Sequence, residues 1–296
     1  MKLARSHTAG LLAGTVAVVG VGLLARASDH DDTPLLKTMP RHDARLTDLF
    51  AFTRGENLVL VVCLDPTVPP AATSYVFASD LTVTINVDTK RAVRFVDADD
   101  LAAYGGTILD PEKIEPDIVF EITVDALGQA HLSTRGLSRH GQWPIQFFAG
   151  LRDDPFIRGP RIGRNVPALV VELPARAVVG NRPRPVLIWA NSRVDDIMGP
   201  FQEHAGRSLR SQFVENDPLN LRTPAEHAAM LGVVPDVVIL DTSVPVAFPN
   251  GRELTDDVVD LVGDARVLNT DAPFPAANDV PFLTTFPYLA EPHPAP

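Results

Sequence analysis

The sequence predicts a mainly β protein with a β-sandwich-like core, a few short helices in its last third and an extended, proline-rich tail. Short apolar segments, several with period-two alternation, recur between residues 55 and 190 and are separated by turn residues. The same region contains no helical pattern of roughly 10–15 residues, which a βαβ fold would need for its crossovers. A single cysteine allows no intrachain disulfide, so stability must come from a sizeable apolar core.

The strands are predicted from their apolar patterns. Residues 58–64 form a continuous apolar, β-branched run, which is typical of a strand buried on both faces. Residues 81–88 and 118–124 place apolar side chains at every second position, as a strand with one buried face does. Shorter segments of the same kind predict further strands at residues 92–96, 130–134, 145–148, 168–173, 186–189 and 237–240.

The helix signals lie in the last third of the chain. Residues 201–214 and 224–231 are expected to form short helices, and Thr223 with Glu226 makes a capping box for the second. Residues 256–262 are expected to form a third helix, because acidic residues in a first turn complement the helix dipole.

The first 27 residues have the pattern of a secretory signal peptide. Lys2 and Arg5 give a positive start, residues 11–24 are apolar, and residues 25–27 form a small-x-small cleavage site. An apolar run of 14 residues is shorter than the roughly 18–20 that a membrane-spanning helix needs. We therefore expect cleavage and an extracytoplasmic product, periplasmic or secreted, that is not inserted in the membrane.

The predicted mature chain, residues 28–296, is expected to be a single β-rich domain, with residues 272–296 wrapping it as an extended tail. The whole chain has a net charge of −11, and loss of the three basic residues of the signal leaves about −14. Nucleic acids and anionic membranes need clustered Lys and Arg, so this charge argues against both as main partners. A net negative charge is compatible with a soluble protein or with one that binds cations.

The start of the mature chain offers one metal-binding pattern. Cleavage would place the α-amine of Ser28 two residues before the imidazole of His30, and four nitrogens in this arrangement suit Cu²⁺ or Ni²⁺. The alternative is that His30, Asp31 and Asp32 have a structural role in the fold, or an oxygen-ligand role. Common catalytic signatures such as G-x-S-x-G, H-E-x-x-H or a Walker loop are missing from the sequence.

Three pairs of adjacent aspartates, each close to an arginine, lie just after predicted strands or at a predicted helix start. With Asp48, one or two of these pairs could hold Ca²⁺ or another divalent metal, or act as acid and base. The alternative is that they form Arg–Asp bridges and helix caps. The pairs are 153–154, 195–196 and 256–257. The predicted metal ligands are His30, Asp48, Asp153, Asp154, Asp256 and Asp257, and the predicted small-ligand contacts are Arg152, Arg193, Asn250 and Arg252.

Several separate segments together resemble a secreted bacterial family, domain of unknown function 4331. These segments are residues 28–30, 47–52, 147–156, 189–193, 249–258 and 286–290. The resemblance covers nearly all of residues 28–290. The family brings no assigned activity, so the resemblance implies an exported single domain and no particular chemistry.

Three hypotheses about function follow. The first is an exported β-sandwich protein that binds a metal or a small ligand without catalysis. The second is a secreted hydrolase that uses an Asp pair together with Arg152 or His42. The third is a structural envelope protein with no ligand.

Overall fold

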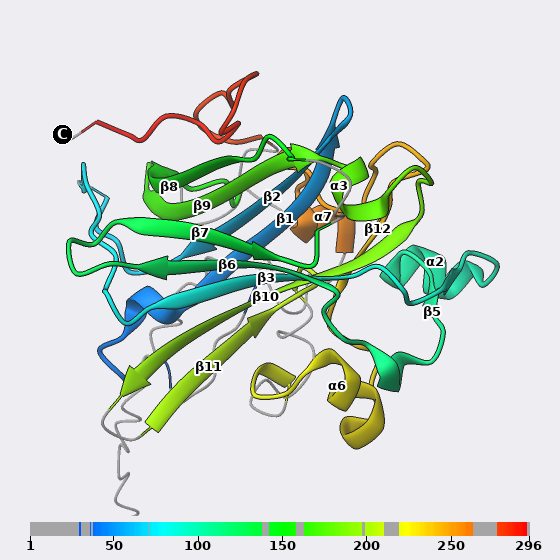
Figure 1. Ribbon diagram of the computed structural model, residues 1–296. Coiled ribbons are helices and arrows are strands. Elements are labelled where there is room, and N and C mark those ends of the chain that lie inside the picture. Colours follow the sequence, from blue (N-terminus) through cyan, green and yellow to red (C-terminus); the bar gives the residue numbers. More distant parts are fainter. Residues whose placement is uncertain are drawn as a thin grey trace, which may run out of the picture.

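The protein is a sandwich of two antiparallel sheets in this computed structural model, and Figure 1 shows the sheets stacked on each other. The first sheet consists, in order, of β1 (Leu46–Arg54), β2 (Asn57–Leu64), β9 (Asn165–Pro174) and β8 (Gln146–Asp153). The second has the order β11 (Gly199–Ala205), β10 (Pro185–Asp196), β3 (Thr82–Asp88), β6 (Ile118–Val124) and β7 (Ala130–Arg135), and β12 (Val238–Asp241) also pairs with β10. The predicted mainly β fold is confirmed. The structure describes residues 30, 36, 38–70, 72–137, 142–157, 163–196, 199–209, 219–262 and 277–294.

Short elements connect the strands. No helix in these described ranges is long and apolar enough to cross a membrane. The helices are α2 (Ala98–Tyr104), α3 (Arg176–Val179), α6 (Pro224–Leu231) and α7 (Val258–Val262), with 3-10 turns η1 (His42–Ala44) and η2 (Pro111–Lys113). The strands β4 (Val93–Arg94) and β5 (Thr107–Ile108) form a separate two-stranded ribbon.

The main core lies between the two sheets and follows the period-two pattern. Val83, Ile85 and Val87 of β3 point into it, as do Ile118 and Phe120 of the neighbouring strand β6. Each of these five side chains is at most 2% exposed. Full burial of one such side chain stabilises the fold by about 1.5–3 kcal/mol, so the alternation alone specifies which face of each strand turns inward.

The four-stranded sheet is also apolar on its outer face, away from the six-stranded sheet. Val61 and Cys63 of β2 lie there and pack in one cluster with Tyr288 and Leu289. These last two residues belong to the tail, defined here as residues 277–294, whose backbone forms neither helix nor strand. Figure 1 shows the tail (red) on the far side of the four-stranded sheet from the six-stranded one. Both faces of β2 are therefore buried, as its continuous apolar run predicts.

Strand β11 corrects one prediction. The helix expected over residues 201–214 is wrong in its first part, because residues 199–205 pair with β10 from Ala205 opposite Ala190 to Gly199 opposite Asp196. Helix propensity is a weak preference, and a neighbouring strand with free hydrogen-bonding groups overrides it. Residues 210–214 of the expected helix lie outside the described part of the chain.

Helix α6 forms where the sequence predicts it and is held by a buried histidine. Thr223 and Glu226 form the expected capping box. The Nε2 atom of His227 lies 2.7 Å from the carbonyl oxygen of Leu219, and its Nδ1 accepts a hydrogen bond from the backbone N–H of Asp236 at 3.1 Å. One ring nitrogen therefore faces an acceptor and the other a donor, an arrangement that the neutral imidazole with its proton on Nε2 satisfies.

A buried ion pair joins β1 to the loop that follows β12. Arg252, 2% exposed, donates through Nη2 to Oδ1 of the fully buried Asp48 at 3.1 Å. Its guanidinium carbon lies 3.9 Å from the ring centroid of Phe50, a cation–π contact. Backbone hydrogen bonds between Ala51 and Arg252 in both directions extend the link. This pair fixes the loop against the edge of the sandwich.

Asp48→Ala should lower the free energy of unfolding by about 3–5 kcal/mol, because it leaves the Arg252 charge buried without its carboxylate. Chemical denaturation of the two proteins measures the difference. The control is Asp80→Ala, which removes one carboxylate from the partly exposed Arg41–Asp80 pair and should cost about 1 kcal/mol or less. Equal losses in the two variants would contradict a special role for the buried pair.

Candidate metal site

Asp153, Asp279 and His293 come together at the end of β8 and form what we call the Asp153 site. Each residue offers one ligand atom, and these atoms all lie within 4.8 Å of one another. The Nε2 atom of His293 is 2.8 Å from Oδ1 of Asp153 and 3.3 Å from Oδ2 of Asp279. Among the residues that the structure describes, this is the one group of at least three potential metal-ligating side chains at such spacing.

Asparagines and a backbone amide hold the three side chains in place. Asn278 donates through Nδ2 to Oδ2 of Asp153 at 2.5 Å, and the backbone N–H of Gly163 donates to Oδ2 of Asp279 at 2.6 Å. Asn165 clamps the backbone of His293 on both sides: its Oδ1 accepts from the His293 N–H at 2.7 Å and its Nδ2 donates to the His293 carbonyl at 3.1 Å. Contacts of this kind orient ligands around metal ions.

The contact between His293 and Asp153 is close but is not aligned as a hydrogen bond. Oδ1 of Asp153 and Nε2 of His293 are both buried atoms, and neither has a hydrogen-bond partner within the described chain. A buried polar atom without a partner costs free energy, so such groups in native structures call for a ligand, a water or an ion. The two atoms are therefore 2.8 Å apart without the alignment of a hydrogen bond, and both can still bind a third group.

The electrostatics of the site centre on Asp153. Burial raises the pKa of Asp153 to about 7, and the nearby carboxylates of Asp279 and Asp154 act in the same direction. The hydrogen bond from Asn278 and the charge of His293 lower this pKa but do not offset the burial. A bound cation would favour the ionised carboxylate, so the site gains the most from a cation at neutral pH and above.

The other acids predicted as metal ligands are not among the three residues of the Asp153 site, and each has a structural partner. Asp48 pairs with Arg252, as described above. Asp256 accepts from the N–H of Glu253 at 2.7 Å, and Asp257 accepts from the N–H of Asp260 at 3.4 Å, at the start of α7. Asp154 is buried beside Asp153, but its Oδ1 accepts from the N–H of Phe156 at 3.1 Å. For these acids the contacts correspond to the alternative in which they form Arg–Asp bridges and caps. Asp153 is the exception.

His30 is buried and lies apart from the Asp153 site. Its Nε2 is 3.4 Å from Oε1 of Glu203 on β11 and 3.4 Å from Nδ2 of Asn220. This position corresponds to the alternative in which His30 is tied into the fold. Ser28 and Asp29 of the predicted Cu²⁺ or Ni²⁺ arrangement, and the predicted signal peptide, lie outside the described residues.

The predicted small-ligand contacts do not converge on one place. Arg152 donates to Glu291 of the tail at 2.5 Å and stacks over the Phe148 ring. Arg193 is exposed on β10, on the opposite sheet. Asn250 is a turn residue, as its Asn-Gly sequence indicates, and its Oδ1 accepts from the N–H of Asp241 at 2.6 Å. Arg252 forms the buried ion pair.

Asp279 and His293 are absent from the set of residues predicted from the sequence. The sequence gives one indication of these two residues: the proline-rich tail is expected to wrap the domain, so its polar residues are expected to contact the domain surface. Asn278, Asp279 and His293 are among the polar tail residues that do so at the end of β8. Which body residues they meet depends on the path of the tail, which the sequence pattern does not specify.

Comparison with known proteins found no matching family model, no matching curated protein and no matching solved structure. The resemblance to domain of unknown function 4331 therefore stays a prediction.

The raised pKa of Asp153 predicts how stability depends on pH. An unfolded Asp has a pKa near 3.9, so between about pH 4 and pH 7 the folded, metal-free protein holds a proton that the unfolded chain has released. The free energy of unfolding should therefore fall as the pH rises through this range, and Asp153→Asn should remove that slope. Denaturant titrations in EDTA at several pH values measure both curves.

The comparison with the variant is necessary because a buried histidine acts in the opposite direction. Burial lowers the pKa of His204 to about 4, so this residue adds stability as the pH rises from about 4 to 6.5. The difference between the wild-type and Asp153→Asn curves cancels this contribution. Parallel curves for the two proteins would show that Asp153 titrates normally.

Proposed function

We propose that the protein is an exported β-sandwich protein that binds a divalent transition-metal ion at the Asp153 site, without catalysis. The observation that carries the proposal is the unaligned 2.8 Å contact between His293 and a fully buried Asp153 carboxylate, with the Asp279 carboxylate 3.3 Å from the same imidazole nitrogen. The fold supplies these three groups at one point and surrounds them with hydrogen-bonding residues. A cation would satisfy the atoms that lack hydrogen bonds.

The donor set favours a transition metal over Ca²⁺. Ca²⁺ is bound by six to eight oxygen atoms, whereas Zn²⁺ takes four ligands and binds both imidazole nitrogen and carboxylate oxygen. Two ligands at about 2.0–2.1 Å from a tetrahedral ion lie about 3.3 Å apart. The separation between His293 and Asp279 already has this value, and that between His293 and Asp153 needs to open by only about half an ångström.

One side of the site faces solvent. The side chains of His293 and Asp279 are 22% and 20% exposed, whereas that of Asp153 is fully buried. An ion can therefore reach the site from the side of the tail, and water can complete its coordination. The buried carboxylate of Asp153 would contact the ion from the protein interior, and His293 and Asp279 would contact it from the solvent side.

Zn²⁺ should bind to the wild-type protein with a stoichiometry of one at the Asp153 site, measured by isothermal titration calorimetry at neutral pH. Asp153→Asn and His293→Gln should each weaken binding by about a hundredfold or more, because each removes one of three ligands. Binding should also weaken below about pH 7, where a proton competes for Asp153.

The matched control is His131→Gln. His131 also lies next to an aspartate, with Nε2 2.8 Å from Oδ2 of Asp125, but the pair is on an exposed hairpin and has no third ligand among the residues that the structure describes. Its loss should leave Zn²⁺ binding unchanged. Absence of Zn²⁺ binding to the wild-type protein, or equal effects of the His131 and His293 variants, would contradict the site. Tighter binding of Ca²⁺ than of Zn²⁺ would contradict the proposed class of metal.

A bound ion would tie the tail to the sheet. Asp153 ends β8, while Asp279 and His293 lie near the two ends of the tail, so the ion would join three points that are distant in the chain. Hydrogen bonds already dock this segment, among them the N–H of Asp153 to the carbonyl of Ala290 at 3.3 Å and the hydroxyl of Tyr288 to Glu172 at 2.8 Å. Binding energy that is available only to the docked tail stabilises that state.

Hydrogen exchange should report this coupling. Zn²⁺ should slow exchange of the backbone amides at residues 282–293 by about tenfold or more, while amides at the centre of β3 should change little. Asp153→Asn should remove the effect of Zn²⁺. If Zn²⁺ binds with the expected stoichiometry and the tail amides do not respond, the metal site stands and its role in docking the tail is wrong.

A further inference from the structure

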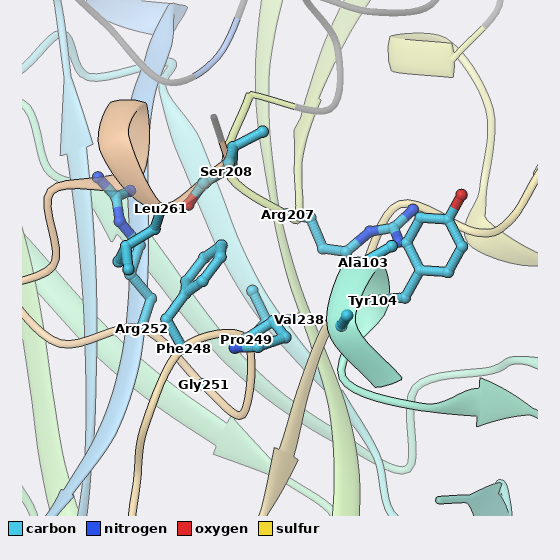
Figure 2. A pocket seen from close by; sticks show the side chains of 12 residues that line it. Ala103, Tyr104, Arg207, Ser208, Val238, Phe248, Pro249, Gly251, Arg252 and Leu261 are labelled. Carbon is cyan, nitrogen blue, oxygen red and sulfur yellow. The ribbon is translucent and has the colours of Figure 1, made fainter. Parts of the chain in front are cut away.

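A cavity of about 320 Å³ lies among the ends of α2 and α7, the residues that follow β11 and the loop that follows β12. Figure 2 shows its side chains, with Arg207 and Tyr104 on one side and Phe248 and Leu261 on the other. It shares no residue with the Asp153 site. Its volume is at the lower end of the range that small-molecule pockets occupy, roughly 300–1,000 Å³.

The two sides of the cavity are suited to a flat, apolar group. The guanidinium carbon of Arg207 lies 4.3 Å from the ring centroid of Tyr104, so these two side chains form one stacked wall. Phe248 and Leu261 supply the apolar surface across from it, and Val238 of β12 adds to the lining. Aromatic and planar groups gain most from contacts with walls of this kind.

Close backbone contacts hold these walls in place. A Cβ atom at Gly105, which follows α2, would lie 2.8 Å from the carbonyl oxygen of Pro249, so the two segments meet backbone to backbone. A Cβ atom at Gly251 would lie 2.6 Å from the carbonyl oxygen of Ala51 in β1. The loop is therefore seated on the sandwich edge, and the cavity exists without a ligand to shape it.

The described residues that line the cavity include basic but no acidic side chains, in an acidic protein. Of the twelve described residues that line the cavity, two are arginines and none is acidic, although the chain has 37 acidic and 26 basic residues. The charge of Arg252 is matched by Asp48. Arg207 lies at the cavity wall, and a guanidinium has five N–H donors, so it can take a ligand oxygen in addition to the partners that it already has.

We infer that this cavity binds a small organic anion with a flat apolar body, such as an aromatic carboxylate. The apolar body would lie between the Arg207–Tyr104 wall and Phe248, and its carboxylate would accept hydrogen bonds from the guanidinium of Arg207. This inference is independent of the metal site, because neither site contributes a residue to the other.

The test uses 2-naphthoate and its uncharged analogue 2-naphthamide as probes of the full chain, with binding measured by calorimetry or ligand-observed NMR. Wild-type protein should bind naphthoate more tightly than naphthamide. Arg207→Gln should weaken naphthoate binding by about tenfold or more and naphthamide binding by less, because only naphthoate loses a charge-assisted hydrogen bond in addition to the contact with the wall. Ala103→Phe, which places a ring at the cavity lining, should weaken both probes.

Arg222→Gln is the matched control, because it removes an arginine that lies outside the cavity lining and pairs with Glu226 on α6. It should bind both probes as the wild type does, and thermal melts check that each variant is folded. Equal binding of naphthoate by the Arg207 and Arg222 variants would overturn the inference, as would wild-type protein that binds neither probe or prefers naphthamide.

Discussion

Strands β2 and β9 are apolar on both faces, and the chain has to keep both faces of the sheet that they form out of water. The six-stranded sheet covers one face and makes the main core. No second sheet is available for the other face within the described chain, where the tail and the segment around Leu254 pack instead. The need to cover this face explains why the tail lies in a fixed place although it is neither helix nor strand. Burial of Tyr288 and Leu289 offsets the loss of conformational entropy when the tail is ordered.

Both candidate sites lie where the segments that pack on the outer face of the four-stranded sheet meet other parts of the protein. The tail crosses the end of β8, where it carries Asp279 and His293 to the buried carboxylate of Asp153. The loop after β12 is held to the edge strand β1 by the Arg252–Asp48 pair, and the cavity forms where this loop meets α2 and α7. In each place a sheet strand supplies one residue of the site and an irregular segment supplies others, which is a common way for folds to build sites.

The sequence predicts those parts of the structure that depend on a local pattern, such as the strands. It does not predict contacts that depend on the path of an irregular segment such as the tail. Period-two alternation predicts β3 and β6 to within a residue of their ends, and the continuous run predicts a doubly buried β2. The sequence identifies Asp153 as an acid that follows a predicted strand. Its partners Asp279 and His293 come later in the sequence than every described strand. No local rule pairs a carboxylate with a tail residue, because the pairing depends on which apolar surface the tail covers.

Protein synthesis proceeds from the amino terminus, and this order has a consequence for the Asp153 site. Every described strand precedes Asp279 and His293, so the strands of the sandwich can pair before these two residues have left the ribosome. A chain in that state exposes the outer face of its four-stranded sheet. A metal bound at the Asp153 site, as we propose, would then be held by its full set of ligands only after the tail has docked on this face.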